Sequence, residues 1–388
     1  MPKFSADYVF PVTAPPLKNG VITTDDSGKI IEISTRDQHR GGDLKIYQGV
    51  IIPGFINTHC HLELSHLHGR IARHTGLSEF VMHINKLRHV SEEEIMEAIV
   101  AADDAMYRNG IVAVGDISNL PISLPVKSGS PIDYYTFIET LDVFIKEKTT
   151  EVIEKANRIS ETINHKNKSI VPHAPYTVSA GLLRLINAAN DHSKVISVHN
   201  QETPEENDFF RFGTGEIREL YGMLNNPLET FSVTGKNSIH HILSHLKPKK
   251  SLILVHNTTS AAGDIQAAKD WDKNVFWATC PIANLYIEDR LPDYDVFISN
   301  GATMTIGTDS LASNHQLSIL EEIKTILKYF PHLSFETLLK WATINGARAL
   351  GFEDRLGSLE VGKQPGLLVL DIKESGQLRE DTKIERIM

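Results

Sequence analysis

The chain has 388 residues, of which 41% are apolar and 23% charged, with a formal net charge of -10 and a pI near 6.0. This acidic balance argues against sequence-independent binding to nucleic acid or to an acidic membrane surface, so we expect small-molecule partners. The first residues are not followed by an apolar segment, and no run approaches the roughly 20 apolar residues of a membrane span, which predicts a cytoplasmic protein. The two cysteines, Cys60 and Cys280, are too few for a disulfide framework.

Both ends of the chain contain short β-like runs. They cover residues 8–10, 20–23 and 29–33 near the start, and residues 357–362 and 367–371 near the end. Neither group has enough strands to bury a core alone. We therefore predict that residues 1–52 and 356–388 fold together as a small β-sandwich, with residues 53–355 inserted between them as one large domain.

The middle of the chain alternates strand-like and helix-like patterns. A capping box, Ser91 with Glu94, predicts a helix that ends near Gly110. Eight such units are typical of a TIM (β/α)8 barrel, so we expect an α/β fold of this class. The candidate strands end at His59, Asp116, Glu139, His173, His199, His256, Cys280 and Asp309.

A His-x-His pair ends the first barrel strand. His59 and His61 point to one face of that strand, because alternate residues share a face, and both can reach one metal ion. The chain has 18 histidines and a second such pair, His66 and His68, so the spacing alone is a weak signal. Only the first pair follows a buried apolar strand, at the end where parallel α/β proteins build their sites.

The ends of two later strands complete a metal site. His199 and Asp309 join His59 and His61 in a set of three nitrogens and one carboxylate, which suits Zn²⁺ and leaves a position for water. No lysine follows the fourth strand to bridge a second metal ion. We therefore expect one ion per subunit.

The chemistry also requires a proton carrier beside the water. Glu202, three residues after His199, can move a proton from water to a leaving nitrogen, although a carboxylate after a strand is more often simply solvated. His256 ends the next strand. It can hydrogen-bond the water, polarise the substrate or bind the metal.

Six motifs follow one another along the chain. They are residues 53–61 (PGFINTHCH), 173–179 (HAPYTVS), His199-x-x-Glu202, His256-Asn257, 280–285 (CPIANL) and 307–310 (GTDS). In this order they resemble the amidohydrolase superfamily, in its deaminase and chlorohydrolase branch. The resemblance implies a distorted TIM barrel with a β-sandwich formed by both termini, and often a homodimer. It also implies Zn²⁺, or Fe²⁺, on His59, His61, His199 and Asp309, with Glu202 as proton shuttle, His256 near the water and Asp309 as a further base.

Five residues are candidate substrate contacts: Glu63, His173, Arg211, Ser310 and Asn314. The resemblance implies that His173 contacts substrate rather than metal. Glu63 is similar to a residue that binds a ribose or heterocycle in some relatives; the alternative is that Glu63 is a loop carboxylate without a role in binding. Arg211 lies among three phenylalanines in the long segment 203–248, which we expect to form a lid or a specificity loop. It can contact a flat ring or an acid, or pack locally. Ser310 and Asn314 begin the helix after the last barrel strand.

These residues predict a hydrolytic deaminase. Metal-activated water adds to a ring carbon of an amino-substituted purine-type heterocycle or nucleoside, and Glu202 protonates the departing amine. The expected substrate is adenine-like, and aminodeoxyfutalosine is among the candidates. The alternative is a chlorohydrolase or a cyclic amidohydrolase of the imidazolonepropionase type on the same single-metal site. A catalytically inactive barrel kept for binding is disfavoured by the complete set of metal and proton-transfer residues. Ile282 stands where many relatives carry Arg or another polar residue, so a carboxylate-binding guanidinium is missing or comes from elsewhere.

Overall fold

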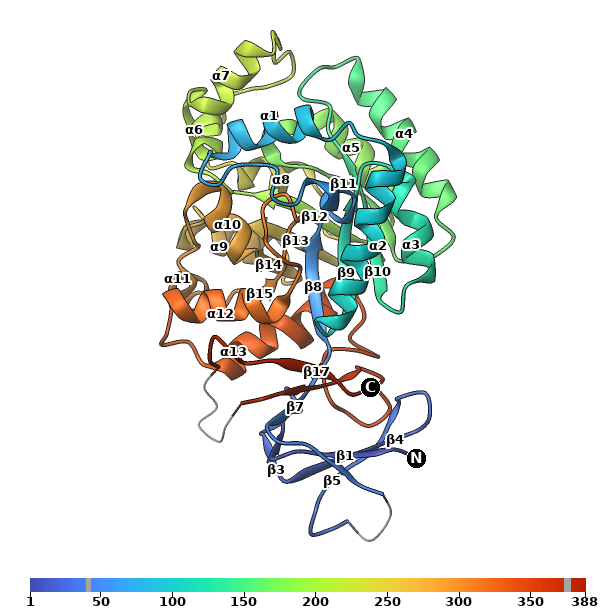
Figure 1. Cartoon of the computed structure of the whole chain (residues 1–388). Coiled ribbons are helices and arrows are strands. Elements are labelled where there is room, and N and C mark those ends of the chain that lie inside the picture. Colours follow the sequence, from blue (N-terminus) through green and yellow to red (C-terminus); the bar gives the residue numbers. More distant parts are fainter. Residues whose placement is uncertain (40–42, 373–377) are drawn as a thin grey trace.

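A computed structural model of the chain describes residues 1–39, 43–372 and 378–388 (Figure 1). The larger part combines helices and strands, and the smaller part is built of strands and contains both labelled termini. In the described ranges, no helix combines the length and the apolar character needed to cross a membrane.

Eight buried strands form the framework of the larger part. Strands β8 to β11 pair in parallel in the order β11-β10-β9-β8, and strands β12 to β15 pair in parallel in the order β12-β13-β14-β15. Each of the eight predicted runs is therefore confirmed as a strand. In chain order they are β8 (Phe55–Cys60), β9 (Ile111–Ser118), β10 (Asp133–Thr140), β11 (Lys168–Pro172), β12 (Val195–Asn200), β13 (Ser251–His256), β14 (Val275–Thr279) and β15 (Thr303–Ile306).

Helices connect these strands and bury their apolar faces against them. The capping box is confirmed, because the Ser91 side chain accepts a hydrogen bond from the Glu94 N–H at 3.2 Å and α2 begins at the next residue. The connections contain η1 (Leu62–Leu67), α1 (Leu77–Leu87), α2 (Glu92–Arg108), η2 (Pro121–Ser123), α3 (Leu124–Gly129), α4 (Lys148–Thr162), η3 (Pro175–Thr177), α5 (Ala180–Ala189), α6 (Pro204–Phe212), α7 (Glu216–Met223), α8 (Ile239–His245), α9 (Ala262–Trp271), α10 (Pro281–Glu288) and α11 (Tyr294–Ser299). After β15 come α12 (Ile319–Tyr329), α13 (Phe335–Lys340), the π-helical turn η4 (Trp341–Asn345) and α14 (Gly346–Leu350).

The two parallel sheets contact each other along both of their outer strands. Between β11 and β12, the His199 N–H donates to the His173 carbonyl at 2.9 Å. Between β15 and β8, Cys60 and Asp309 form a parallel bridge, and the Thr308 N–H donates to the His59 carbonyl at 3.0 Å. These contacts bring His59, His199 and Asp309 together from different sheets.

The smaller part consists of two sheets, one of which joins both ends of the chain. The first sheet has the order β5-β4-β1-β6 and the second the order β17-β16-β7-β2-β3. In the second, β16 runs antiparallel to β7, with Val369 opposite Ile51. Residues 357–362, expected as part of the far-end β fragment, do not form a strand. The strands are β1 (Lys3–Ser5), β2 (Tyr8–Val9), β3 (Leu17–Lys18), β4 (Gly20–Thr24), β5 (Ile30–Thr35), β6 (Lys45–Ile46), β7 (Val50–Pro53), β16 (Leu367–Leu370) and β17 (Ile384–Arg386).

A buried amide holds β15 to β8 beside the site. The Asn57 side chain donates to the Thr308 hydroxyl at 2.8 Å and accepts from the backbone N–H of Thr308 at 3.1 Å, and it is fully buried. Replacing Asn57 by Ala removes both of these bonds, and also the bond that Oδ1 accepts from the His59 N–H at 3.3 Å, and leaves buried groups with fewer partners. We expect Asn57→Ala to lower the free energy of unfolding by about 2 to 4 kcal/mol, measured by urea denaturation in excess EDTA.

The control is Gln266→Ala, which removes an exposed amide of α9. Its unfolding free energy is expected to stay within about 0.5 kcal/mol of the parent. An Asn57→Ala protein as stable as this control would contradict the role assigned to the amide.

Candidate active site

Four side chains from three strand ends converge on one point. The Nε2 atom of His61 lies 3.2 Å from Nε2 of His59 and 3.2 Å from Nε2 of His199. The Oδ1 atom of Asp309 lies 3.7 Å from His59 Nε2 and 3.6 Å from His61 Nε2. All four residues are buried. The structure therefore brings together the four residues that the sequence predicted as metal ligands.

The spacing of these atoms fits the ligands of a single small cation. Zinc–nitrogen bonds of about 2.0–2.1 Å in a tetrahedron place neighbouring ligand atoms about 3.3–3.4 Å apart. Without a cation, His61 Nε2 carries at most one proton, so only one of its two short contacts can be a hydrogen bond. A shared metal ion accounts for both contacts, because each nitrogen then directs its lone pair at the ion.

Neighbouring groups orient two of these ligands. Nδ1 of His199 donates to the carbonyl of His173 at 2.8 Å, which leaves its Nε2 with the free lone pair that a metal requires. The Ser313 hydroxyl donates to Oδ2 of Asp309 at 2.7 Å, so Oδ1 remains available. Nδ1 of His59 is buried and has no hydrogen-bond partner in the described part of the chain.

The electrostatics of the cluster keep its histidines neutral. Burial, together with the neighbouring imidazoles, lowers the pKa of His59 and His199 well below the ordinary value. Burial likewise lowers the pKa of His61 to about 3. A neutral imidazole is the form that binds a metal ion. These three histidines are therefore in the neutral form that a cation site requires.

Glu202 and His256 lie beside the cluster. Nδ1 of His256 donates to the amide oxygen of Asn284 at 2.8 Å, which leaves Nε2, 3.6 Å from Oε1 of Glu202, as an acceptor. Burial and the nearby Asp309 raise the pKa of Glu202 well above its ordinary value. The ligand atoms of His256, His59 and His199 lie within 4.8 Å of one another, so both the metal-binding and the catalytic interpretation of His256 stay open.

Backbone conformation contributes to this arrangement. His256 has φ +74° and Asp309 has φ +57°, in the left-handed region that residues other than glycine rarely adopt. Such conformations concentrate at functional sites, because the surrounding structure has to stabilise them. At both residues the chain turns sharply after a parallel strand, which directs the side chain into the cluster.

The cluster opens into a cavity of about 260 Å³, here called the site cavity. Two of the predicted substrate contacts, His173 and Ser310, line it, together with Glu202 and His256. Apolar side chains form much of the remaining wall. They come from η1, α1, the end of β10, α7 and α10, and include Leu64, Phe80, Leu141, Ile217, Tyr221 and Ile287. The α7 residues show that part of segment 203–248 covers the cavity.

Three predicted substrate contacts do not line the site cavity. Glu63 is buried, and its Oε2 accepts the backbone N–H groups of Asn119 and Leu120 at 3.1 and 3.2 Å, which is the role of a loop-holding carboxylate. The Asn314 side chain donates to the Thr308 carbonyl at 2.9 Å and supports the turn after β15. Arg211 is exposed, with its guanidinium 4.8 Å from the centre of the Phe212 ring.

The position of Arg211 follows from the packing of α6. Phe209 and Phe210 are buried in the cluster beneath segment 203–248, so the next two residues of the helix face outwards. The local-packing interpretation is therefore correct for Phe209 and Phe210. In this structure Arg211 is not placed to contact a ligand in the site cavity.

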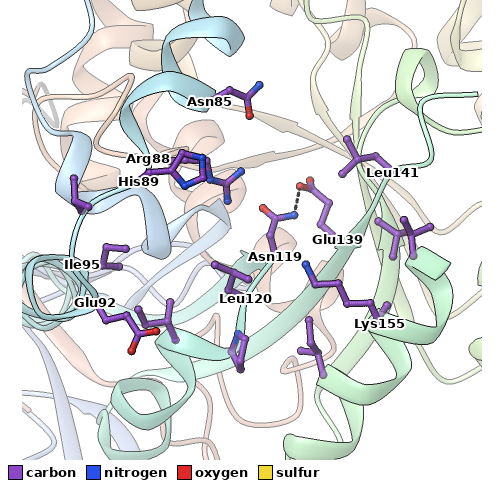
Figure 2. Close-up of a pocket in the computed structure, with 17 residues that line it drawn as sticks. Asn85, Arg88, His89, Glu92, Ile95, Asn119, Leu120, Glu139, Leu141 and Lys155 are labelled. Carbon is purple, nitrogen blue, oxygen red and sulfur yellow. Dashed lines mark hydrogen bonds between the residues drawn. The ribbon is translucent and has the colours of Figure 1, made fainter. Parts of the chain in front are cut away.

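The sequence did not identify three polar residues that line the site cavity. Arg88 follows α1, Asn119 follows β9, and Glu139 lies near the end of β10. Figure 2 shows the three side chains around one space, with Asn119 Nδ2 donating to Glu139 Oε2 at 2.9 Å. Glu139 was recognised only as a strand end, and Arg88 belongs to no motif.

Comparisons with known proteins indicate the family and the fold of the chain. A family model described as the amidohydrolase family matches residues 50–387. A 5'-deoxyadenosine deaminase of Methanococcus maripaludis is 28% identical over 343 residues, covering 84% of this chain and 75% of that protein. The structure of Helicobacter pylori aminofutalosine deaminase in complex with methylthio-coformycin has a TM-score of 0.81 at 23% identity, covering 96% of this chain and 93% of that one. The zinc complex of atrazine chlorohydrolase from Arthrobacter aurescens has a TM-score of 0.74 at 16% identity, covering 97% and 90%.

The chain belongs to the amidohydrolase family, because the family model matches most of its length. It is therefore an amidohydrolase-type hydrolase with a mixed α/β fold, as the motifs indicated. The His and Asp cluster supports metal binding. The identity of the metal and the roles of the individual site residues stay predictions.

Metal analysis of two histidine variants tests the cluster. We expect about one Zn²⁺ per chain in the parent. Loss of a residue that only hydrogen-bonds a metal ligand weakens metal binding roughly 10- to 100-fold, and we expect His61→Ala to weaken zinc binding by more than this. The control is His68→Ala, an exposed member of the second His-x-His pair. Both are measured by mass spectrometry of the metal after dialysis against a zinc buffer. Equal zinc contents in the two variants would argue against the assignment.

Proposed function

We propose that the protein is a metal-dependent hydrolytic deaminase that acts on an amino-substituted purine-type heterocycle or nucleoside. The observation that carries this proposal is the convergence of His59, His61, His199 and Asp309, with Glu202 and His256 in the same cavity. A relative named as a deaminase and a fold shared with an aminofutalosine deaminase give further support. The predicted products are the hydroxylated ring and ammonia.

The donor set of the cluster suits one Zn²⁺, with Fe²⁺ as the other candidate. In the proposed site His59, His61, His199 and Asp309 hold it, and His173 supplies the carbonyl that orients His199. When bound, such an ion lowers the pKa of a water ligand toward neutrality. The zinc complex of atrazine chlorohydrolase, which has the same fold, is consistent with this choice.

The residues around the cluster provide for proton transfer. Glu202 faces both His256 and the cavity, so it can take a proton from water and give it to the departing amine. The acceptor Nε2 of His256 is available to hold the attacking water, and Asp309 is a second base on the same side. Overall, one water and one amino-substituted ring carbon yield a ring hydroxyl or carbonyl and ammonia.

The site cavity suits a flat apolar ring. Leu64, Phe80, Leu141 and Tyr221 provide apolar and aromatic wall, whereas the polar groups gather at the cluster. In the proposed complex, the amino-substituted carbon of the heterocycle lies at Glu202, and the rest of the ring packs against these apolar side chains. Aminodeoxyfutalosine remains one of the candidate substrates.

We propose in addition that β8 to β15 close into the distorted barrel of this family within residues 53–355. The hydrogen bonds between the two sheets on both sides support closure. We propose that residues 1–52 and 356–388 form the β-sandwich, which is supported by a buried cluster drawn from both ends of the chain, including Phe4, Ile51 and Val369. The homodimer and the cytoplasmic location stay predictions.

A chlorohydrolase or cyclic amidohydrolase is the alternative on the same site, because the chlorohydrolase shares the fold. Ammonia release from amino-substituted purines, compared with chloride release from chlorotriazines, separates the two. Chloride release without ammonia release would overturn the deaminase proposal.

Substitution of the proton carrier tests the mechanism. We expect Glu202→Gln to reduce kcat for ammonia release by about 10²- to 10⁴-fold, because the amide cannot carry the proton. Zinc content is expected to remain at the parental level, because Glu202 is not one of the proposed ligands. Both are measured on zinc-loaded protein with an ammonia-coupled assay and metal analysis.

The control is Glu161→Gln, an exposed carboxylate of α4. It is expected to keep the parental kcat. A Glu202→Gln enzyme that deaminates at the parental rate with its metal in place would refute the role of Glu202.

A further inference from the structure

A buried carboxylate of α6 holds the turn that carries Glu202. Glu206 is fully buried, and each of its two oxygens accepts one backbone N–H group of this turn. Oε1 accepts the N–H of Gln201 at 3.0 Å, and Oε2 accepts the N–H of Glu202 at 3.2 Å. Glu206 does not line the site cavity. Its bonds are made to the backbone of the proposed proton carrier, and not to the space that a substrate can enter.

The backbone of this turn needs support. Strand β12 ends at Asn200, and the next residue, Gln201, has φ +47°, in the left-handed region that residues other than glycine rarely adopt. The N–H groups that follow the strand have left its ladder and need other acceptors, and consecutive N–H groups in a turn bind an anion together. The Glu206 carboxylate is that anion here. It therefore stabilises the conformation from which the Glu202 side chain reaches the site cavity.

The hydrogen bonds of Glu206 differ from those of an ordinary helix cap. Thr203 is the N-cap residue of α6, and Glu206 occupies the third position of the helix. In a capping box, a glutamate at that position bonds the N–H group of the N-cap residue itself. Glu206 instead bonds the two residues before Thr203, which belong to the turn. These bonds fix the position of Glu202 rather than the start of the helix.

The loop after β13 holds the other side of the same turn. The Thr258 hydroxyl donates to the Glu202 carbonyl at 2.7 Å, and the Thr259 N–H donates to the Gln201 carbonyl at 3.2 Å. This loop begins directly after His256, so the supports of Glu202 and of His256 belong to one connected piece of backbone. Held from both sides, Glu202 lies with Oε1 3.6 Å from Nε2 of His256.

The two backbone N–H groups require a carboxylate rather than an amide. Burial raises the pKa of Glu206 to about 7, whereas hydrogen bonds from Ser238 and from the two N–H groups act in the opposite direction. A carboxylate accepts a hydrogen bond at each oxygen, but the amide of glutamine offers one acceptor and one donor group. Glutamine in place of Glu206 therefore keeps the shape of the side chain and leaves one N–H group facing an NH2 group.

We propose that Glu206 and Thr258 are positioning residues of the proposed deamination, which hold the proton carrier Glu202 at the reacting carbon through its backbone. This proposal rests on the proposed function, in which Glu202 carries the proton. Because both residues act through Glu202, they affect the rate only while Glu202 can carry a proton. A residue that only stabilised α6 or the cavity wall would affect the rate equally with or without the Glu202 carboxylate.

A double-mutant cycle tests this dependence. Ammonia release from adenine and from adenosine is measured on zinc-loaded protein for Glu206→Gln, for Thr258→Val and for each of them combined with Glu202→Gln. We expect Glu206→Gln to lower kcat about 10- to 100-fold and Thr258→Val about 3- to 10-fold, with KM within about 3-fold of the parent, because a misplacement of about 1 Å suffices for such a loss. In the Glu202→Gln background, each substitution is expected to change kcat by less than about 3-fold.

The control is Asp208→Asn, which makes the same change from carboxylate to amide at a half-buried position of α6. It is expected to leave kcat unchanged in both backgrounds. If Glu206→Gln does not fold, Thr258→Val acts on the same turn from another element and decides the outcome.

Crystal structures of the zinc-loaded parent and variants supply a readout that needs no turnover. We expect the distance from Oε1 of Glu202 to Nε2 of His256 to increase by about 1 Å in Glu206→Gln and in Thr258→Val, and to stay at the parental value in Asp208→Asn.

The outcomes separate this proposal from the proposed function. Ammonia release that the two substitutions lower by the same factor in both backgrounds, or do not lower at all, overturns the positioning role and leaves the deaminase intact. A displaced Glu202 in the variant crystals, without ammonia release from the parent, supports the positioning of Glu202 and counts against the deaminase. An undisplaced Glu202 without ammonia release counts against both.

Discussion

The constraint on which this structure depends is a buried group of imidazoles in which Nε2 of His61 lies 3.2 Å from Nε2 of both His59 and His199. Neutral imidazoles at that distance direct lone pairs at each other unless a proton or a cation lies between them. Burial disfavours the protonated forms, because it lowers the pKa of each of these histidines. A proton on a neutral ring can occupy only one of the two short contacts of His61, whereas a divalent cation accounts for both, and Asp309 supplies the predicted fourth ligand.

The rest of the molecule can be understood as support for this cluster. The predicted ligands come from strands of two different sheets, so the hydrogen bonds between β15 and β8 and between β11 and β12 determine whether they meet. Outer partners then fix which ring nitrogen faces the centre, as the His173 carbonyl does for His199. Left-handed backbone at His256 and Asp309 aims both side chains inwards, at a conformational cost that the packed strands offset. In this view, the strand ends carry the catalytic groups. The connections that follow the strands determine selectivity.

The sequence predicted the strands and the ligand set because both leave local signals. Apolar β-branched runs predict the strands, and a His or Asp at the end of a run predicts a metal ligand. All eight strands and the four converging side chains were therefore identified. Other features depend on tertiary packing and leave no such signal. Arg211 follows two phenylalanines that turn inwards, which directs the arginine outwards. Asn314 and Glu63 lie just after two of the motifs and were predicted as substrate contacts, but in the structure their side chains hydrogen-bond backbone groups. Arg88, Asn119 and Glu139 are about 20 to 30 residues apart and meet only because their elements border the same cavity.

The central claim is that one divalent ion is shared by four protein atoms. Anomalous diffraction at the zinc absorption edge, on crystals of zinc-loaded protein, tests it most directly. The account predicts one strong peak at about 2.0–2.2 Å from Nε2 of His59, His61 and His199 and from Oδ1 of Asp309. A protein that shows no peak at this point, or a peak only at another group such as Glu139 and His173, would contradict the account.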